Sequence, residues 1–313
     1  MKGLELSRRY YETYGLPMLE EQFPEILDKI AIGLTGSGSE CYGFDDEISQ
    51  DHDFEPGFCI FLPEEEVVDR KKEFELTRAY NKLPAEFEGY KKSMLSPVGG
   101  NRHGVFRCRE YYEERVGTPD GLLTLEQWLM LPDYVLSEAV NGEIFRDDSG
   151  LVTTVRNNLS NVPEDVLKKR IAGNVLLMGQ SGQYNYERCL KRNDTGAAQL
   201  AINEFVLSTI KTCFLLNGKF APYYKWSFRA ISELDRLSEV GEFLNYLLNN
   251  GNDPEQARIK KDMINTVSEL LNDVLLEKGY VKEANSDLEK QAYTINNCIV
   301  DAEIRNLNIL ISV

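Results

Sequence analysis

The sequence is poor in the residues on which most zinc and redox sites depend. It contains only two histidines, His52 and His103, in 313 residues, which argues against a zinc site and against a mechanism that needs several histidines. Its six cysteines include no Cys-x-x-Cys pair, so neither a zinc ribbon nor a small disulfide framework is indicated. We expect these thiols to be reduced and mostly buried. Any metal chemistry must therefore depend on carboxylates.

Long apolar segments are also missing. No run approaches the ~18 apolar residues that a membrane span needs. The N-terminal stretch MKGLELSRRYYETYG contains no apolar core followed by a small-residue cleavage site. We therefore expect a cytoplasmic protein that has no membrane partner.

Three common nucleotide and calcium motifs are absent from the glycine-rich segment 34–62. A P-loop would need a Gly-Lys-Ser sequence, and the dinucleotide-binding fingerprint would need a third glycine where Cys41 stands. A calcium loop that began at Asp51 would need glycine in place of Pro56 and an acid in place of Leu62. These absences leave other phosphate-binding arrangements open.

The composition is that of a globular protein with a strongly acidic surface. Hydrophobic residues make up 42% and charged residues 27% of the chain. The formal charge is -16, from 51 acidic and 35 basic residues, and this field repels long duplex nucleic acid. We expect no nucleic acid partner, although a local basic site for a nucleotide triphosphate remains compatible with the total charge. The length suits two domains.

The first half of the chain mixes helix and strand patterns. Residues 5–29 have helical spacing with a break at Gly15-Leu16-Pro17, which predicts two helices. Apolar runs at 31–36 and 57–62 predict buried strands. The other predicted elements of this half are a helix within 64–83, a strand within 103–112, and a hairpin over 142–156 about a turn at 147–150.

The second half has the periodicity of helices throughout. The predicted helical segments lie at roughly 164–190, 197–216, 222–240, 255–278 and 285–311. We therefore predict an α+β protein with a mixed sheet and helices in residues 1–160, followed by an all-α helical-bundle domain in residues 161–313.

One segment combines a glycine turn with paired acids between the two predicted strands. The turn is Gly38-Ser39, and the acids are Asp51 and Asp53. In an extended chain these two carboxylates would point to the same side, about 6 to 7 Å apart, where they can share magnesium ions. Glycine allows backbone N–H groups to approach phosphate closely, and the serine hydroxyl adds a donor. The segment therefore predicts a triphosphate between the turn and the acids.

This order of features resembles the nucleotidyltransferase superfamily. Its signature is a hydrophobic strand, Gly-Ser, a gap of roughly ten residues, and Asp-x-Asp before a second strand; here eleven residues separate Ser39 from Asp51. The wider sequence GSGSECYGFDDEISQDHDF, together with APYYKWSFRAI at 221–231, resembles an uncharacterised bacterial family of unknown function related to antibiotic nucleotidyltransferases.

The resemblance implies a chemistry and the residues that perform it. Asp51 and Asp53 would bind magnesium, Gly38 and Ser39 would contact phosphate, and a nucleoside monophosphate would pass from a nucleotide triphosphate, ATP being the first candidate, to a hydroxyl of a small molecule or protein. The superfamily's third carboxylate is expected in the strand within 103–112. Arg107 stands about where that acid belongs, and Glu110 is the nearby candidate.

Two basic residues of the helical domain are further candidates for phosphate contact. Lys225 is predicted in the first turn of a helix, where a cation opposes the helix dipole unless an anion binds beside it. Antibiotic nucleotidyltransferases place a lysine of the helical domain on the phosphates, and the resemblance carries this role to Lys225. Arg188 belongs to a polar cluster at 183–192 that either lines the cleft or forms a solvated helix face.

A second functional class fits the same features. A non-catalytic nucleotide-sensing or protein-interaction module, including an antitoxin-like one, would keep the fold and one metal site without the transfer reaction. Catalysis and nucleotide binding are therefore separate predictions.

Overall fold

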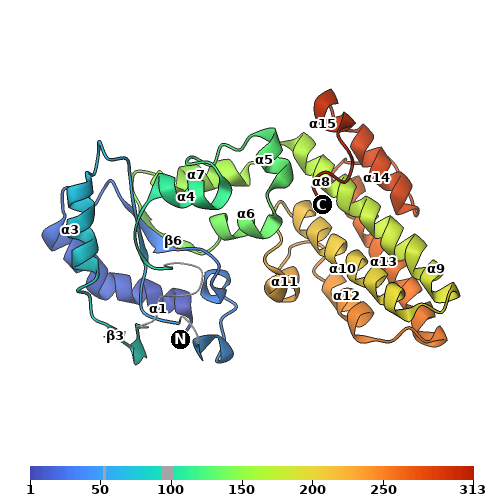
Figure 1. The fold of residues 1–313 in the computed structure, drawn as a ribbon, viewed down its shortest axis with the longest axis horizontal. Coiled ribbons are helices and arrows are strands. Elements are labelled where there is room, and N and C mark those ends of the chain that lie inside the picture. The colour runs from blue at the N-terminus through green and yellow to red at the C-terminus, as the bar shows by residue number, and fades with distance from the viewer. Residues whose placement is uncertain (52–53, 93–101) are drawn as a thin grey trace. The chain divides into compact units, whose positions relative to one another are not determined.

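The chain forms two compact units, and each is described by itself. The computed structural model describes residues 1–51, 54–92 and 102–313 (Figure 1). The first unit comprises Met1–Thr124 and Val135–Asn161, and the second comprises Leu125–Tyr134 and Val162–Val313. The sequence predicts one boundary, between residues 160 and 161, and so places residues 125–134 in the first domain. The structure assigns this segment to the second unit.

A four-stranded mixed sheet forms the centre of the first unit. Its strand order is β5-β2-β1-β6, and the bounds are β1 Ala31–Leu34, β2 Cys59–Leu62, β5 Gly104–Arg107 and β6 Glu143–Asp147. Strand β1 is antiparallel to β2 and to β6, whereas β2 is parallel to β5. A separate two-stranded sheet pairs β3 (Glu86–Phe87) with β4 (Tyr90–Lys91).

The central strands form because their side chains are apolar on both faces. Every residue of β1 and β2 is buried, as expected for an inner strand covered on both sides. Phe58 packs against Tyr10 and Tyr80, with ring centroids 6.0 and 5.0 Å away. The Tyr80 hydroxyl also accepts a hydrogen bond from Phe58 N (3.0 Å) and donates one to Phe58 O (2.8 Å). These contacts with Tyr10 and Tyr80 therefore fix the position of Phe58, the residue just before β2.

Helices and short helical turns surround this sheet. They are α1 Gly3–Tyr10, the π-helix η1 Tyr11–Gly15, α2 Leu16–Gln22, the 3-10 helices η2 Ser39–Tyr42 and η3 Ile48–Asp51, α3 Arg70–Tyr80, α4 Cys108–Val116 and α7 Leu151–Ser160. Helix α6, Asp133–Val140, begins in the second unit and ends in the first.

The predicted break between two N-terminal helices is wrong. Gly15 has helical backbone angles, and η1 joins α1 to α2 in one continuous helical run. A Cβ atom at Gly15 would lie 2.4 Å from the Phe58 ring. The glycine therefore allows close packing onto the aromatic core instead of ending a helix.

The predicted hairpin over 142–156 is half right. Its first strand is β6, but Gly150, with φ 72°, turns the chain into α7. The Asp147 carboxylate accepts hydrogen bonds from the backbone N–H groups of Leu151, Val152 and Thr153 at 2.7, 3.0 and 2.8 Å. This capping stabilises a helix in a segment whose β-branched residues favour a strand.

The second unit consists of helices and contains no strand. Its remaining helices are α5 Leu125–Met130, α8 Glu164–Met178, the π-helix η4 Gly179–Asn185, α9 Tyr186–Lys191, α10 Thr195–Leu216, α11 Tyr224–Ile231, α12 Val240–Asn249, α13 Pro254–Glu277, α14 Leu288–Asn297 and α15 Ala302–Asn306. Helices α10 and α14 pack along α8 (Figure 1). Taken with the mixed sheet of the first unit, this agrees with the predicted α+β class.

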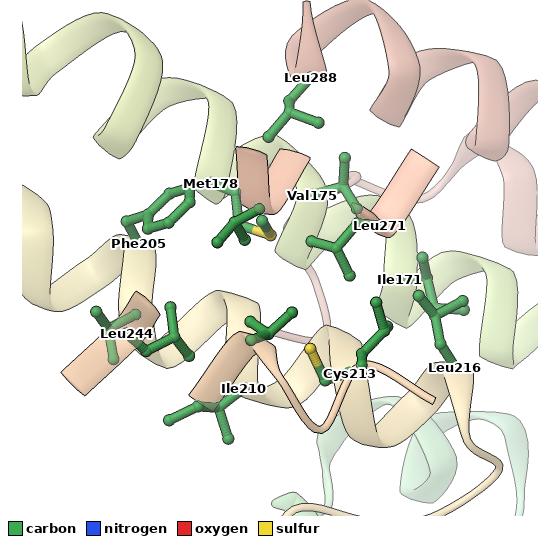
Figure 2. Packing of buried hydrophobic residues seen from close by; sticks show 14 of the residues in the cluster. Ile171, Val175, Met178, Phe205, Ile210, Cys213, Leu216, Leu244, Leu271 and Leu288 are labelled. Carbon is green, nitrogen blue, oxygen red and sulfur yellow. The ribbon is translucent and has the colours of Figure 1, made fainter. Parts of the chain in front are cut away.

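The core of the second unit is aliphatic. Figure 2 shows Ile171, Val175 and Met178 of α8 among side chains from four other helices: Phe205, Ile210, Cys213, Leu216, Leu244, Leu271 and Leu288. Helix α10 is the one helix of the described residues that is long and apolar enough to cross a membrane, but 67% of its most apolar stretch is buried inside this unit. That burial is typical of the core helix of a soluble protein.

Candidate functional site

The Gly38-Ser39 turn and the segment that ends at Asp51, both proposed from the sequence as parts of the site, lie at one edge of the four-stranded sheet. Because β1 runs opposite to β2 and β6, its carboxyl end lies beside the amino ends of those strands, and the parallel pairing of β2 with β5 adds the amino end of β5. Gly38 and Ser39 follow β1, and η3, which ends at Asp51, precedes β2. We call this side of the sheet the Gly-Ser edge.

Asn141 fixes the turn that leaves β1. Its side-chain Oδ1 accepts a hydrogen bond from Gly36 N (3.0 Å), and its Nδ2 donates to Gly36 O (2.7 Å). Thr35 Oγ1 donates to the same Oδ1 at 3.2 Å. Gly36 has φ 125°, a conformation that favours glycine. The turn is thus held by the residue that precedes β6, and no motif in the sequence pointed to Asn141.

Gly38 makes room for a buried carboxylate. The glycine caps η2 with φ -70° and ψ 149°, which any residue can adopt. A Cβ atom at this position would lie 1.9 Å from Oε1 of Glu40, a residue that is only 8% exposed. Next to it, Ser39 O accepts a hydrogen bond from Phe44 N at 3.0 Å. Sequence reasoning missed Glu40 because an acid in a polar loop gives no sign of burial.

Asp45 is a second buried acid at the Gly-Ser edge. Its Oδ2 accepts a hydrogen bond from Gly3 N at 2.8 Å, so it binds the amino end of α1, where the helix dipole favours a negative charge. Its Oδ1 lies 3.8 Å from Lys2 Nζ and has no hydrogen-bond partner among the described residues. Asp45 is 2% exposed. The carboxylate therefore docks the N-terminal helix against the loop that follows Gly38.

Of the two predicted magnesium ligands, the structure describes only the backbone of Asp51. Asp51 is the last residue of η3, so the extended backbone predicted there is wrong, and β2 begins only at Cys59. The Asp51 side chain and the whole of Asp53 lie outside the described residues. Elsewhere in the part of the chain that is described, no group of three or more His, Cys, Asp or Glu side chains is placed to hold a metal.

A histidine and a glutamate meet where β2 and β5 begin. His103 Nδ1 lies 3.5 Å from Glu55 Oε1, and the His103 side chain is 9% exposed. A Cβ atom at Gly57 would lie 2.6 Å from His103 Cγ. Gly57 therefore lets the imidazole pack directly on the backbone before β2. Sequence reasoning assigned no separate role to these three residues.

Glu110 lies at the opposite edge of the sheet. Because β5 is parallel to β2, residues that follow β5 lie beyond its carboxyl end, away from Gly38 and Ser39. Glu110 Oε1 accepts from Arg70 Nη2 at 2.7 Å at the surface. The buried Arg107 binds Glu73 Oε2 through Nε and Nη2, at 2.9 and 2.8 Å. The prediction that Glu110 joins the acids at the Gly-Ser turn is therefore not supported by the sheet topology.

Comparison with known proteins adds one match. Residues 128–227 match the family model described as a domain of unknown function (DUF4037). The match covers less than half of the chain; it starts in α5, ends in α11, and leaves out the Gly-Ser edge apart from the amino end of β6 and Asn141. The search of curated proteins gives no match.

The matched stretch contains both basic residues proposed for phosphate contact. Lys225 is exposed in the first turn of α11, as predicted, and its Nζ lies 4.9 Å from the centre of the Trp226 ring. Arg188 is on α9, where its guanidinium stacks on Tyr184 (4.7 Å) and hydrogen-bonds the Tyr184 hydroxyl. Both belong to the second unit, and each is engaged there with an aromatic neighbour.

Proposed function

We propose that this protein is a cytoplasmic, magnesium-dependent nucleotidyltransferase that moves a nucleoside monophosphate from a nucleotide triphosphate, ATP being the first candidate, to a hydroxyl of a small molecule or a protein. The observation that carries the proposal is the strand arrangement. It brings the Gly38-Ser39 turn and the segment that ends at Asp51 to one edge of a mixed sheet. The nucleotidyltransferase-like fold that we propose has these features in the same order along the chain.

The proposed roles follow from the chemistry of the residues. Asp51 and Asp53 supply hard oxygen ligands, which magnesium prefers. Bound magnesium would neutralise phosphate charge. Backbone N–H groups of the turn at Gly38 and Ser39 would donate to phosphate, and Asn141 keeps that turn in place before any ligand arrives. Lys225 and Arg188 are proposed to contact phosphate from the helical unit.

The second candidate function is a non-catalytic nucleotide-sensing or protein-interaction module, including an antitoxin-like one. It is favoured by the position of Glu110, since the acid chosen as the third carboxylate lies at the edge opposite to the Gly-Ser turn. Such a module would bind magnesium and nucleotide without transfer.

Release of labelled pyrophosphate separates these two functions. The full-length protein is incubated with magnesium and each nucleotide triphosphate in turn, with and without candidate hydroxyl acceptors. A transferase releases pyrophosphate in proportion to modified acceptor. Saturable nucleotide binding without release under every condition would support the sensing module, and absence of nucleotide binding would contradict both proposals.

A valine at position 38 tests the proposed phosphate turn. Gly38→Val places a branched side chain where the Glu40 carboxylate lies and where phosphate would approach the backbone. We expect affinity for magnesium-ATP to fall about tenfold or more while the protein stays folded. Calorimetric titration measures the affinity, and circular dichroism checks the fold.

A double variant separates packing from phosphate contact at the same position. Gly38→Val with Glu40→Ala removes the carboxylate that the valine displaces. Weak binding in both variants supports the phosphate contact. Recovery of parental affinity in the double variant would show that Gly38 serves only to accommodate Glu40.

Methionine at position 225 tests the proposed contact from the helical unit. Lys225→Met keeps an apolar stem beside Trp226 and removes the charge. We expect triphosphate affinity to fall roughly threefold to tenfold at low salt, because one charge-assisted hydrogen bond is lost. The melting temperature should stay unchanged because Lys225 is exposed. Equal affinity in variant and parent would exclude a phosphate contact by Lys225.

A further inference from the structure

The second unit contains a cavity of about 500 Å³ that none of the proposed roles uses. Helices α5, α8, α10 and α11, the segment 131–134 that leads into α6, and the segment 311–313 contribute its walls. Its size falls in the range of small-molecule sites, about 300 to 1,000 Å³. Its aliphatic lining residues include Leu129, Leu131, Leu207, Ile210 and Ile311.

Three tyrosines stand together on the lining of this cavity. The rings of Tyr134 and Tyr223 are 5.8 Å apart between centroids, and those of Tyr223 and Tyr224 are 4.4 Å apart. They keep 40%, 40% and 68% of their surface exposed. Partly exposed aromatic rings over an apolar cavity offer large faces for stacking at a low cost in conformational entropy. This group suits a planar, aromatic ligand.

The only acidic side chain on the lining is already neutralised. Asp133, which is 7% exposed, accepts a hydrogen bond from Arg170 Nη2 at 2.7 Å. Arg170 also donates to the carbonyl oxygens of Trp128 (2.9 Å) and Leu131 (3.3 Å), while its buried Nε has no acceptor within the described residues. This pair supports the wall of the cavity and brings no net charge.

Lys211 is a second basic side chain on the lining. It lines the cavity from α10, and within the described residues its side chain takes part in no hydrogen bond or ion pair. Two basic side chains therefore face one acidic side chain, in a chain whose formal charge is -16. The Lys211 charge acts on Asp133 together with that of Arg170, but Lys211 belongs to no ion pair among the described residues. A cation without an ion pair beside apolar walls favours an anionic ligand.

We propose that this cavity binds a planar aromatic molecule that carries one anionic group, with the ring against Tyr223 and its tyrosine neighbours and the anion at Lys211. The site lies wholly within the second unit, so the proposal is independent of the function proposed for the Gly-Ser edge. Most of its lining belongs to the stretch that matches the family of unknown function.

Three small probes test the ligand class on the full chain. They are 2-naphthoate, the neutral 2-naphthalenemethanol, and the aliphatic anion cyclohexanecarboxylate, each titrated by ligand-observed NMR. We expect saturable binding of one 2-naphthoate per chain, at least about tenfold tighter than either comparison probe. Absence of saturable 2-naphthoate binding, or equal affinity for all three probes, would overturn the proposal.

Variants of Lys211 locate the anion. Lys211→Met should weaken 2-naphthoate binding to the level of the neutral probe and leave binding of the neutral probe unchanged, whereas Lys211→Arg should restore it. Lys219→Met, at an exposed lysine outside the cavity, is the matched control and should have no effect. Near-ultraviolet circular dichroism shows whether each variant is folded. Unchanged 2-naphthoate affinity in folded Lys211→Met would place the anion elsewhere and refute the assignment.

A change in the tyrosine group locates the ring. Tyr223→Leu removes the middle ring of the group and keeps an apolar side chain. Affinity for both naphthalene probes should fall together, by about threefold to tenfold, the scale of lost aromatic contacts. Retention of full affinity for both probes would contradict the proposed stacking.

Discussion

Asparagine at position 51 or 53 is expected to reduce magnesium-dependent ATP binding about 100-fold. Each change keeps the side chain's shape and removes one of the two negative charges proposed to bind the metal. Loss of one partner of a closely paired charge costs about 2 to 5 kcal/mol, and 1.4 kcal/mol corresponds to tenfold in affinity. Isothermal calorimetry with ATP, in magnesium and in EDTA, measures the effect.

The neighbouring acid Asp46 provides the control for this prediction. Its Oδ1 accepts hydrogen bonds from Ile48 N and Ser49 N, both at 3.1 Å, so it has a local structural role. Asp46→Asn removes the same charge from the same loop and keeps that oxygen, and affinity should stay near that of the parent. If Asp51→Asn and Asp53→Asn bind no more weakly than Asp46→Asn, the metal assignment is wrong.

Methionine at position 169 is expected to destabilise the second unit by about 3 kcal/mol or more. Lys169 is fully buried, and its ammonium donates to Asn296 Oδ1 (2.9 Å), Arg305 O (3.2 Å) and Leu307 O (2.7 Å). Its removal leaves Asn296 Oδ1 and Leu307 O without this donor, each at a cost of about 1 to 3 kcal/mol, whereas Arg305 O still accepts a hydrogen bond from Asn296 Nδ2 (3.2 Å). Urea unfolding followed by circular dichroism measures the change.

Lys260 is the matched comparison for Lys169. It too is fully buried, but in the described part of the chain its one hydrogen-bond acceptor is Asn252 Oδ1 (3.1 Å), which also accepts from the Tyr186 hydroxyl (2.9 Å). Lys260→Met therefore leaves that oxygen satisfied and removes a buried charge, so we expect a gain of about 1 kcal/mol at neutral pH. Equal loss of stability in both variants would show that burial alone, and not the number of acceptors, decides the effect.

The effect of Lys260→Met should depend on pH. Burial lowers the pKa of Lys260 from its ordinary 10.5. Between the lowered value and 10.5 the unfolded chain binds more protons, so the lysine's contribution to stability rises with pH across that interval. The advantage of the methionine variant should therefore be largest at pH 7 and shrink toward pH 10.5. A constant difference over this range would contradict the lowered pKa.

The parts of the fold that were predictable are those with a strong local pattern. The strands β1 and β2 are short apolar runs bounded by glycine or proline, and they are buried on both faces. Helix α13, predicted at roughly 255–278, spans Pro254–Glu277, and Asp253 caps its amino end by accepting hydrogen bonds from Glu255 N and Gln256 N. In these segments, local preference and burial agree.

The wrong predictions arose where a distant contact overrides a local signal. Gly15 predicts a helix break by its residue type, but it packs against Phe58, more than forty residues later in the sequence. The position of Glu110 depends on the parallel pairing of β5 with β2, which no local pattern reveals. In both cases the deciding partner lies far along the chain.

The candidate site was predictable in outline only. Spacing along the chain indicated that Gly38, Ser39 and the acids before β2 meet, and the antiparallel pairing places these segments at one edge. The residues that support that edge were not predictable. Asn141 is about a hundred residues from the turn that it holds, and the burial of Asp45 depends on the docking of α1.

The assignment of residues 125–134 to the second unit limits how the protein can be dissected. The three hydrogen bonds that the buried Arg170 guanidinium donates all go to this segment, to Trp128 O, Leu131 O and Asp133 Oδ1. A fragment cut at the apparent boundary near residue 161 would keep the guanidinium and lose all of these acceptors. A buried charge left without its partners costs several kcal/mol. That is a large part of the free energy of unfolding of a whole domain, about 5 to 15 kcal/mol. We therefore expect the helical half to fold on its own only if residues 125–134, which precede β6 in the chain, are supplied with it.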